Sequence, residues 1–100
     1  MSKKPRLPIL YIKPHCSWCR EARAFFANNG IEVDIRDVVE NETDYERMIQ
    51  VSGQTKTPTF EYGEFVVADF DIPEFLSELE EFPEIRKDLG LEEERETQLD

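Results

Sequence analysis

The sequence predicts an α/β protein in which helices flank a four-stranded mixed sheet, with the elements in the order β-α-β-α-β-β-α. Three observations support this fold class. Residues 7–12 form a continuous apolar run, which is typical of a strand buried on both faces. The spacing of apolar residues then changes from helical to alternating over residues 16–37, which completes a β-α-β unit. Two short strand patterns, at residues 58–62 and 65–67, flank Gly63 and Glu64 and indicate an antiparallel hairpin.

The β-α-β unit covers residues 7–37, and we expect its first strand to lie in the centre of the sheet. Its helix is marked by apolar residues at i, i+4, i+7 and i+8, namely Trp18, Ala22, Phe25 and Phe26. Gly30 predicts the end of that helix. Ile31, Val33 and Ile35 alternate with charged residues, so the second strand is expected there, joined in parallel by a right-handed crossover.

Two more helices are indicated by their termini. The second begins at a capping box that opens with Thr43, and it ends at Gly53. The third opens with Asp71 as its cap, followed by Pro73 and Glu74 in its first turn. The residues of this helix that we expect to be buried share one face: Ile72, Phe75, Leu76 and Leu79.

Size and charge limit the classes of partner. The chain has 100 residues and a mass of 11.8 kDa, the size of one domain. Its net charge of -11 argues against nucleic acid or an anionic membrane as a partner. Residues 1–23 carry six bases and one acid, so this part either receives an anionic substrate or holds solvated charge.

The absence of a long apolar run or a secretory signal leads us to expect a cytoplasmic protein, and we also expect a monomer.

The chain has only two cysteines, Cys16 and Cys19, separated by two residues. A structural zinc site usually needs four ligands, and the only histidine, His15, adjoins Cys16, so we expect no metal here. A structural disulfide is disfavoured because it would close a very small loop in a protein that we expect in the cytoplasm. A redox pair is the preferred interpretation, since the motif lies in a β-α-β pattern. The alternative is two small apolar side chains at the start of a helix.

The position of the cysteines favours redox chemistry. The thiolate is the attacking species, and free cysteine, with a pKa of about 8.5, is mostly protonated at neutral pH. Unpaired backbone N–H groups and the dipole at a helix N-terminus stabilise an anion, and Lys13 is close in sequence. We therefore expect a lowered pKa for Cys16. Cys19, one turn later, is expected to be more buried, as suits a resolving thiol.

The segment Tyr-Ile-Lys-Pro-His-Cys-Ser-Trp-Cys at residues 11–19, together with Thr57-Pro58, resembles the glutaredoxins of the thioredoxin-fold superfamily. The resemblance extends over residues 7–82 and implies a thioredoxin-like fold. It also implies that Cys16 is the nucleophile, that Cys19 resolves the mixed disulfide and that Pro58 is cis. We accordingly expect a glutaredoxin-like domain over residues 1–83 and an acidic tail over residues 84–100, disordered from Glu92 onward.

The resemblance also implies residues that contact glutathione or a disulfide substrate. Lys13 and Gln54 stand where family members contact a glutathione carboxylate, and the alternatives are a solvated lysine and a plain loop residue. Trp18 would wall the substrate groove or else pack on its helix. The backbone of Thr57 would pair with an extended substrate. The helix start at Phe70 and Asp71 would offer backbone N–H donors.

The sequence departs from the family pattern at two places near this expected site. Lys56 precedes Thr57-Pro58 and adds a positive charge. Ala68 and Asp69 replace a Gly-Gly pair that lets the backbone approach an anionic carboxylate. The first departure favours an anionic substrate, and the second opposes one.

The resemblance implies an enzyme that reduces protein disulfides or glutathione mixed disulfides, an electron-transfer activity in cell redox homeostasis. Glutathione would be a co-substrate, with no permanently bound cofactor. The partners would be glutathione, disulfide-containing proteins and a glutathione or thioredoxin reductase. One alternative is a carrier of a [2Fe–2S] cluster held between two subunits by Cys16 and glutathione. Another is a binding module with no catalysis.

Overall fold

The structure is a computed structural model that describes residues 7–91. The elements follow one another along the chain as β1 (Ile9–Ile12), α1 (Ser17–Asn28), β2 (Asp34–Asp37), α2 (Glu42–Ser52), β3 (Thr59–Tyr62), β4 (Phe65–Ala68), α3 (Ile72–Leu79) and α4 (Pro83–Asp88). This is the predicted order with one additional helix at its end.

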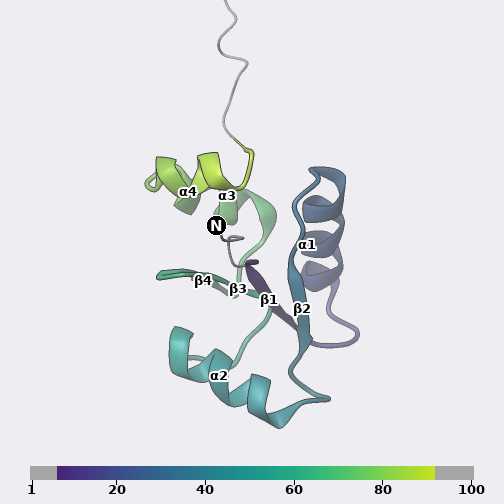
Figure 1. The fold of residues 1–100 in the computed structure, drawn as a ribbon. Coiled ribbons are helices and arrows are strands. Elements are labelled where there is room, and N and C mark those ends of the chain that lie inside the picture. Colours follow the sequence, from purple (N-terminus) through teal and green to yellow (C-terminus); the bar gives the residue numbers. More distant parts are fainter. Residues whose placement is uncertain (1–6, 92–100) are drawn as a thin grey trace, which may run out of the picture.

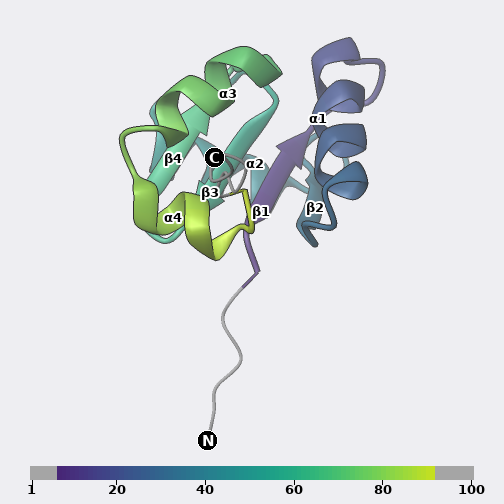
Figure 2. The same cartoon turned by 90° about the horizontal axis from the view of Figure 1, so that it is seen from above.

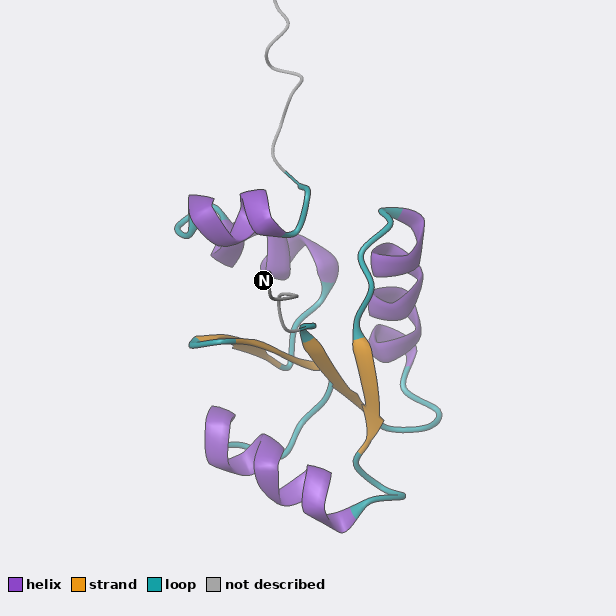
Figure 3. Ribbon diagram, in the orientation of Figure 1, coloured by secondary structure: helices purple, strands orange, loops and turns teal. Residues whose placement is uncertain are grey.

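The strands form one sheet in the order β2-β1-β3-β4, with β1 in the interior as predicted. β1 is parallel to β2 and antiparallel to β3, and β3 and β4 are antiparallel, so the sheet is mixed. Helices cover both faces of the sheet (Figure 3). α2 lies on one face, and α1, α3 and α4 lie on the other (Figure 1). From above, α1 stands on one side of β1 and the α3–α4 pair on the other (Figure 2).

Two predicted element boundaries are wrong, and hydrogen bonds explain both. The cap of α2 is Asn41 rather than Thr43, because the Asn41 side-chain oxygen accepts from the backbone N–H of Asp44 at 3.1 Å. β2 begins only at Asp34, so Ile31 and Val33 precede the strand. The N–H of Ile31 instead donates to the carbonyl of Phe26 at 2.8 Å, which closes the end of α1.

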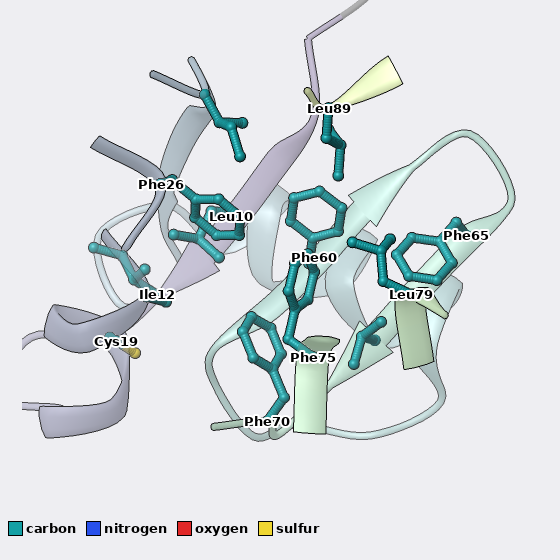
Figure 4. Close-up of a cluster of buried hydrophobic side chains, with 13 residues drawn as sticks. Leu10, Ile12, Cys19, Phe26, Phe60, Phe65, Phe70, Phe75, Leu79 and Leu89 are labelled. Atoms are coloured by element: carbon teal, nitrogen blue, oxygen red, sulfur yellow. The ribbon is translucent and has the colours of Figure 1, made fainter. Parts of the chain in front are cut away.

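The main core lies between the sheet and α1, α3 and α4. Its centre is an aromatic cluster around Phe75, whose ring centroid is 4.9 Å from that of Phe60 and 5.3 Å from that of Phe26 (Figure 4). Cys19 belongs to the same hydrophobic core and is only 2% exposed. The packing that stabilises the fold therefore also holds one cysteine of the motif in place.

The opposite face of the sheet contains a small polar network beneath α2. The hydroxyl of buried Tyr11 donates to one carboxylate oxygen of Glu61 at 2.7 Å, and Arg47 donates to the other at 2.8 Å. Burial, followed by the neighbouring Glu61 carboxylate, raises the pKa of Tyr11 above its usual value. The buried Glu61 charge is thus fully partnered, as a buried carboxylate must be.

The predicted domain boundary at residue 83 does not match the packing. Residues 83–88 form α4, and Leu89, 8% exposed, is part of the main core. Ile85 and Leu91 pack against that core. The folded unit therefore extends to Leu91, because these apolar side chains dock rather than remain in a tail. The predicted disorder from Glu92 onward lies outside the described residues.

One predicted core residue is wrong. Leu76 is 37% exposed, whereas Phe75 and Leu79 are fully buried. The helix is short, so Phe75 and Leu79, four residues apart, take up its inward face and turn Leu76 away from it.

None of the helices within residues 7–91 has the length and apolar character needed to cross a membrane.

The packing of Leu89 leads to a stability prediction. Leu89→Ala should lower the free energy of unfolding by about 2–5 kcal/mol, because it leaves a cavity in the core. Leu76→Ala removes the same atoms from a half-exposed position and should cost much less. Urea unfolding of both variants measures the difference. If Leu89→Ala lowered the free energy of unfolding as little as Leu76→Ala, α4 and Leu89 would not belong to the folded unit.

Candidate functional site

Cys16 and Cys19 form a disulfide at the junction between β1 and α1. Their Cα atoms are 5.1 Å apart, as expected for a bridged pair. Cys16 is half-buried, whereas Cys19 is 2% exposed and lies at the edge of the aromatic core (Figure 4). Cys16 is therefore the sulfur that a substrate can reach, and Cys19 lies behind it.

Cys16 is the N-cap residue of α1, and its sulfur takes the place of a capping oxygen. The backbone N–H of Cys19 donates to the Cys16 Sγ at 3.2 Å. The first turn of α1 contains no acidic residue that would oppose a negative charge there. When the disulfide is reduced, the same N–H and the helix dipole favour the thiolate of Cys16.

A second segment, 41 residues further along the chain, meets Cys16. The carbonyl oxygen of Thr57 lies 3.9 Å from the Cys16 Sγ, and the Thr57 hydroxyl donates to the same sulfur at 3.7 Å. The Thr57–Pro58 peptide bond is cis, as the family resemblance implied. Thr57 thus places backbone and side-chain polar atoms directly beside the reachable sulfur.

Lys13 joins the end of β1 to the loop before Thr57. Its Nζ donates to the carbonyl oxygen of Thr55 at 2.9 Å. This contact holds a positive charge at the loop, and Lys13 lines one pocket together with Cys16. Lys13 is therefore a bridging residue and not merely a solvated lysine at a strand end.

Gln54 braces the same loop through its whole amide group. Its Nε2 donates to the hydroxyl oxygens of Ser52 at 2.8 Å and Thr59 at 3.2 Å, and its Oε1 accepts from the N–H of Lys56 at 2.8 Å. Both hydroxyl hydrogens are already used, since Ser52 donates to the Met48 carbonyl and Thr59 to the Lys56 carbonyl. Both N–H groups of Gln54 are therefore engaged inside the protein.

Thr59 is a residue that the sequence argument missed. Its hydroxyl donates to the carbonyl of Lys56 at 2.9 Å while accepting from Gln54, so it closes the loop that carries Thr57. A threonine in a predicted strand gives no signal of such a role, because the contact depends on how the loop folds back.

The other predicted site residues lie at the surface or in the core. Trp18 is 41% exposed, so it does not belong to the buried stripe of α1. The Phe70 ring is 1% exposed and lies in the core, which leaves only its backbone for a ligand. Asp71 caps α3, since its side chain accepts from the N–H of Glu74 at 2.9 Å.

Asp69 stands where the family pattern has the second residue of a Gly-Gly pair, and its backbone shows why glycine suits that position. Its φ is 54°, in the left-handed region that glycine adopts most easily and that aspartate tolerates better than most residues. Its N–H donates to the carbonyl of Pro58 at 2.8 Å, so the turn before α3 is tied to the cis-proline segment. The exposed Asp69 carboxylate adds negative charge at that turn.

Within residues 7–91, no three His, Cys, Asp or Glu side chains cluster in a way that could hold a metal ion.

The fold and the site together are those of a thioredoxin-like protein with a dithiol-type cysteine pair. The family model described as Glutaredoxin matches residues 9–67, which is more than half of the chain. The chain belongs to the glutaredoxin family.

Solved structures support the thioredoxin-like fold. The thioredoxin-like protein BC3987 is similar with a TM-score of 0.65 and 25% identity, over 72% of this chain and 99% of that chain. A threonine-to-alanine variant of BC3987 gives the same TM-score and identity, over 97% of its chain. The glutaredoxin grx-1 from Archaeoglobus fulgidus is similar in fold, with a TM-score of 0.63 and 14% identity, over 72% of this chain and 84% of that chain. A comparison with curated protein sequences gave no match.

The capping geometry leads to a prediction for the reduced protein. The N–H of Cys19 and the start of α1 should lower the pKa of the Cys16 thiol, so its thiolate forms at lower pH than that of free cysteine. The rate of iodoacetamide alkylation at Cys16, followed against pH in Cys19→Ser protein, should therefore reach its midpoint below about 8.5. A midpoint at or above the value for free cysteine would contradict this.

The Gln54 network leads to a second prediction. Gln54→Glu keeps the shape but places an oxygen against the Ser52 and Thr59 oxygens, so it should lower the free energy of unfolding by about 1–3 kcal/mol. Gln50→Glu makes the same change at an exposed site of α2 and should stay within about 0.5 kcal/mol of the parent. Urea unfolding tests both variants. Unchanged stability in Gln54→Glu, with only a raised apparent KM for glutathione, would indicate a ligand contact instead of a brace.

Proposed function

We propose that the protein is a thiol–disulfide oxidoreductase that reduces protein disulfides or glutathione mixed disulfides. The observation that carries this proposal is the asymmetry of the cysteine pair. Cys16 is reachable, caps α1 and lies beside Thr57, whereas Cys19 is buried behind it within bonding distance. An exposed nucleophile backed by a protected resolving thiol is the arrangement that dithiol exchange requires.

The reaction starts from the reduced protein. The Cys16 thiolate attacks one sulfur of the substrate disulfide, a mixed disulfide forms, and the other substrate sulfur leaves as a thiolate that takes up a proton. Cys19 then loses its proton and attacks the Cys16 sulfur, which releases the second substrate thiol and forms the Cys16–Cys19 disulfide. The two cysteines are oxidised by two electrons, and the substrate disulfide is reduced by two.

We infer that the Thr57 segment orients the substrate. The Thr57 backbone lies next to the Cys16 sulfur, where an extended substrate could pair with it as a short added strand. Trp18, between the two cysteines of the motif, is exposed and would wall the substrate groove. Both contacts would hold the substrate sulfur in line with Cys16.

We infer that glutathione is the co-substrate, with Lys13 as its main carboxylate contact. A lysine ammonium has three donors, and the Thr55 carbonyl uses one of them. The backbone N–H groups at Phe70 and Asp71 would serve a second carboxylate, opposed by the Asp69 charge. Gln54 would act by holding the loop, since its N–H groups are engaged. Thioredoxin reductase is the alternative electron donor. We expect the protein to act in the cytoplasm as a monomer.

The deciding experiment follows NADPH consumption with a glutathione mixed disulfide of a small thiol as substrate. One assay supplies glutathione and glutathione reductase, and the other supplies thioredoxin reductase. The parent protein should turn over with glutathione, and Cys16→Ser should fall to background because the nucleophile is lost.

Cys19→Ser is the matched control. It should retain turnover of the glutathione mixed disulfide, because a second glutathione can attack the mixed disulfide at Cys16. Turnover only with thioredoxin reductase would identify a different electron donor for the same fold. No turnover in either assay would contradict the oxidoreductase proposal and favour the cluster carrier, which anaerobic reconstitution with iron and sulfide would then test by its visible absorbance.

A further inference from the structure

A pocket of about 240 Å³ opens beside the disulfide and is lined by basic side chains. Cys16 and Cys19 border it, together with Lys13, Arg20 and Arg23, which we call the basic pocket. Thr57, which contacts the Cys16 sulfur, does not line it. The reachable sulfur therefore has the Thr57 segment on one side and the basic pocket on another.

The lining of the basic pocket carries more positive than negative charge. Asp37 is the one acidic residue among the lining residues, against three basic ones. One of its carboxylate oxygens accepts from the N–H groups of Val39 at 2.9 Å and Glu40 at 3.1 Å, so Asp37 holds the turn after β2. The remaining lining residues are Ile12, Pro14 and His15. The pocket thus presents a positive charge next to the nucleophile.

The two arginines are available for an anion. Among residues 7–91, neither Arg20 nor Arg23 forms an ion pair, in contrast to Arg36 and Arg47. They are three residues apart on α1 and therefore share one face of the helix. Guanidinium groups bind carboxylates through paired N–H donors, and such pairs gain strength at a partly enclosed surface.

The positive pocket is an exception on an acidic protein. The whole chain has a net charge of -11, so most of its surface repels an anionic partner. An acidic polypeptide would be attracted where cations gather, and one such place borders Cys16. Complementary charge of this kind speeds the association of the polypeptide with the protein and fixes its orientation, more than it increases the affinity.

We propose that the basic pocket receives a carboxylate side chain of a polypeptide substrate, placed within a few residues of the cysteine that Cys16 attacks. The carboxylate must be close in sequence to the substrate cysteine, because Cys16 itself borders the pocket and each extended residue spans only about 3.3 Å. The substrate class is thus a disulfide in an acidic polypeptide. This inference rests on the proposed oxidoreductase function. The basic pocket takes no part in the bond changes.

The test uses peptides that carry one cysteine in a disulfide with 2-thiopyridine. Attack of the Cys16 thiolate on the peptide sulfur forms the mixed disulfide and releases pyridine-2-thione, which is followed by absorbance. The protein is first reduced and then separated from the reductant, so no electron donor takes part. Two peptides differ only in having Glu or Gln on both sides of the cysteine.

The ratio of the Glu-peptide rate to the Gln-peptide rate is the quantity that reports on the basic pocket. In the parent protein the Glu peptide should react about tenfold faster at low salt. The ratio should approach one at an ionic strength of about 1 M, where the Debye length is about 3 Å. Because it is a ratio, a change in the reactivity of Cys16 itself cancels.

Arg20→Gln and Arg23→Gln should each reduce this ratio about threefold or more. Lys87→Gln is the matched control, because it removes one positive charge from an exposed helix, α4, at the opposite end of the molecule. Leu89, just after α4, lines a pocket with Pro8 before β1, whereas Cys16 follows the end of β1. The control should leave the ratio unchanged.

The outcomes separate this inference from the proposed function. No thione release from either peptide would overturn the oxidoreductase proposal itself. Release from both peptides at equal rates, or an equal loss of the ratio in Lys87→Gln, would overturn the basic pocket alone. The 2-thiopyridyl disulfide of glutathione serves as a further arm. If Arg20→Gln and Arg23→Gln slow that compound as much as the Glu peptide, the assignment to a polypeptide is wrong.

Discussion

The packing of α1 against the sheet is the interaction on which the rest of the site depends. Cys19, Ala22 and Phe26 form the buried face of this helix and meet the aromatic cluster around Phe75. Since Cys19 is held in the core, the helix can begin only with Cys16 at the surface, where its sulfur receives the N–H of Cys19. The core therefore makes the two thiols unequal, and this inequality is what a nucleophile and a resolving thiol require.

The second constraint is the loop that brings Thr57 to the cysteine motif. This loop comes from the other half of the chain and meets the motif through the contacts of Thr57 with Cys16. Gln54 and Thr59 brace it from within, and Lys13 ties it to the end of β1. The Thr57 side of the proposed site is thus maintained by hydrogen bonds, one of them from the charged Lys13 ammonium, whereas the basic pocket on another side of Cys16 carries the charges of Arg20 and Arg23. Under the two proposals, the Thr57 side would align the substrate disulfide and the basic pocket would attract a charged chain.

Local signals predicted the fold well where one residue decides the backbone. The Asp71 cap was confirmed, and Gly63 has the positive φ, 59°, that the tight hairpin requires. Predictions were less successful where two local patterns competed or where burial was inferred from spacing alone. The helix cap predicted at Thr43 is at Asn41 instead, and Leu76, predicted to be buried, is exposed. Spacing shows which residues share a face, but not which faces the core finally covers.

The sequence by itself determined the order of the elements, the position of Cys16 and Cys19 at a strand–helix junction and the family resemblance, because these depend on short-range patterns. Only the tertiary structure decided that the Thr57 hydroxyl contacts Cys16 and that Arg20 and Arg23 share a pocket with the disulfide. The physical reason is that these are contacts between elements. They depend on the packing of α1 and β3 against β1, and no local propensity specifies that arrangement.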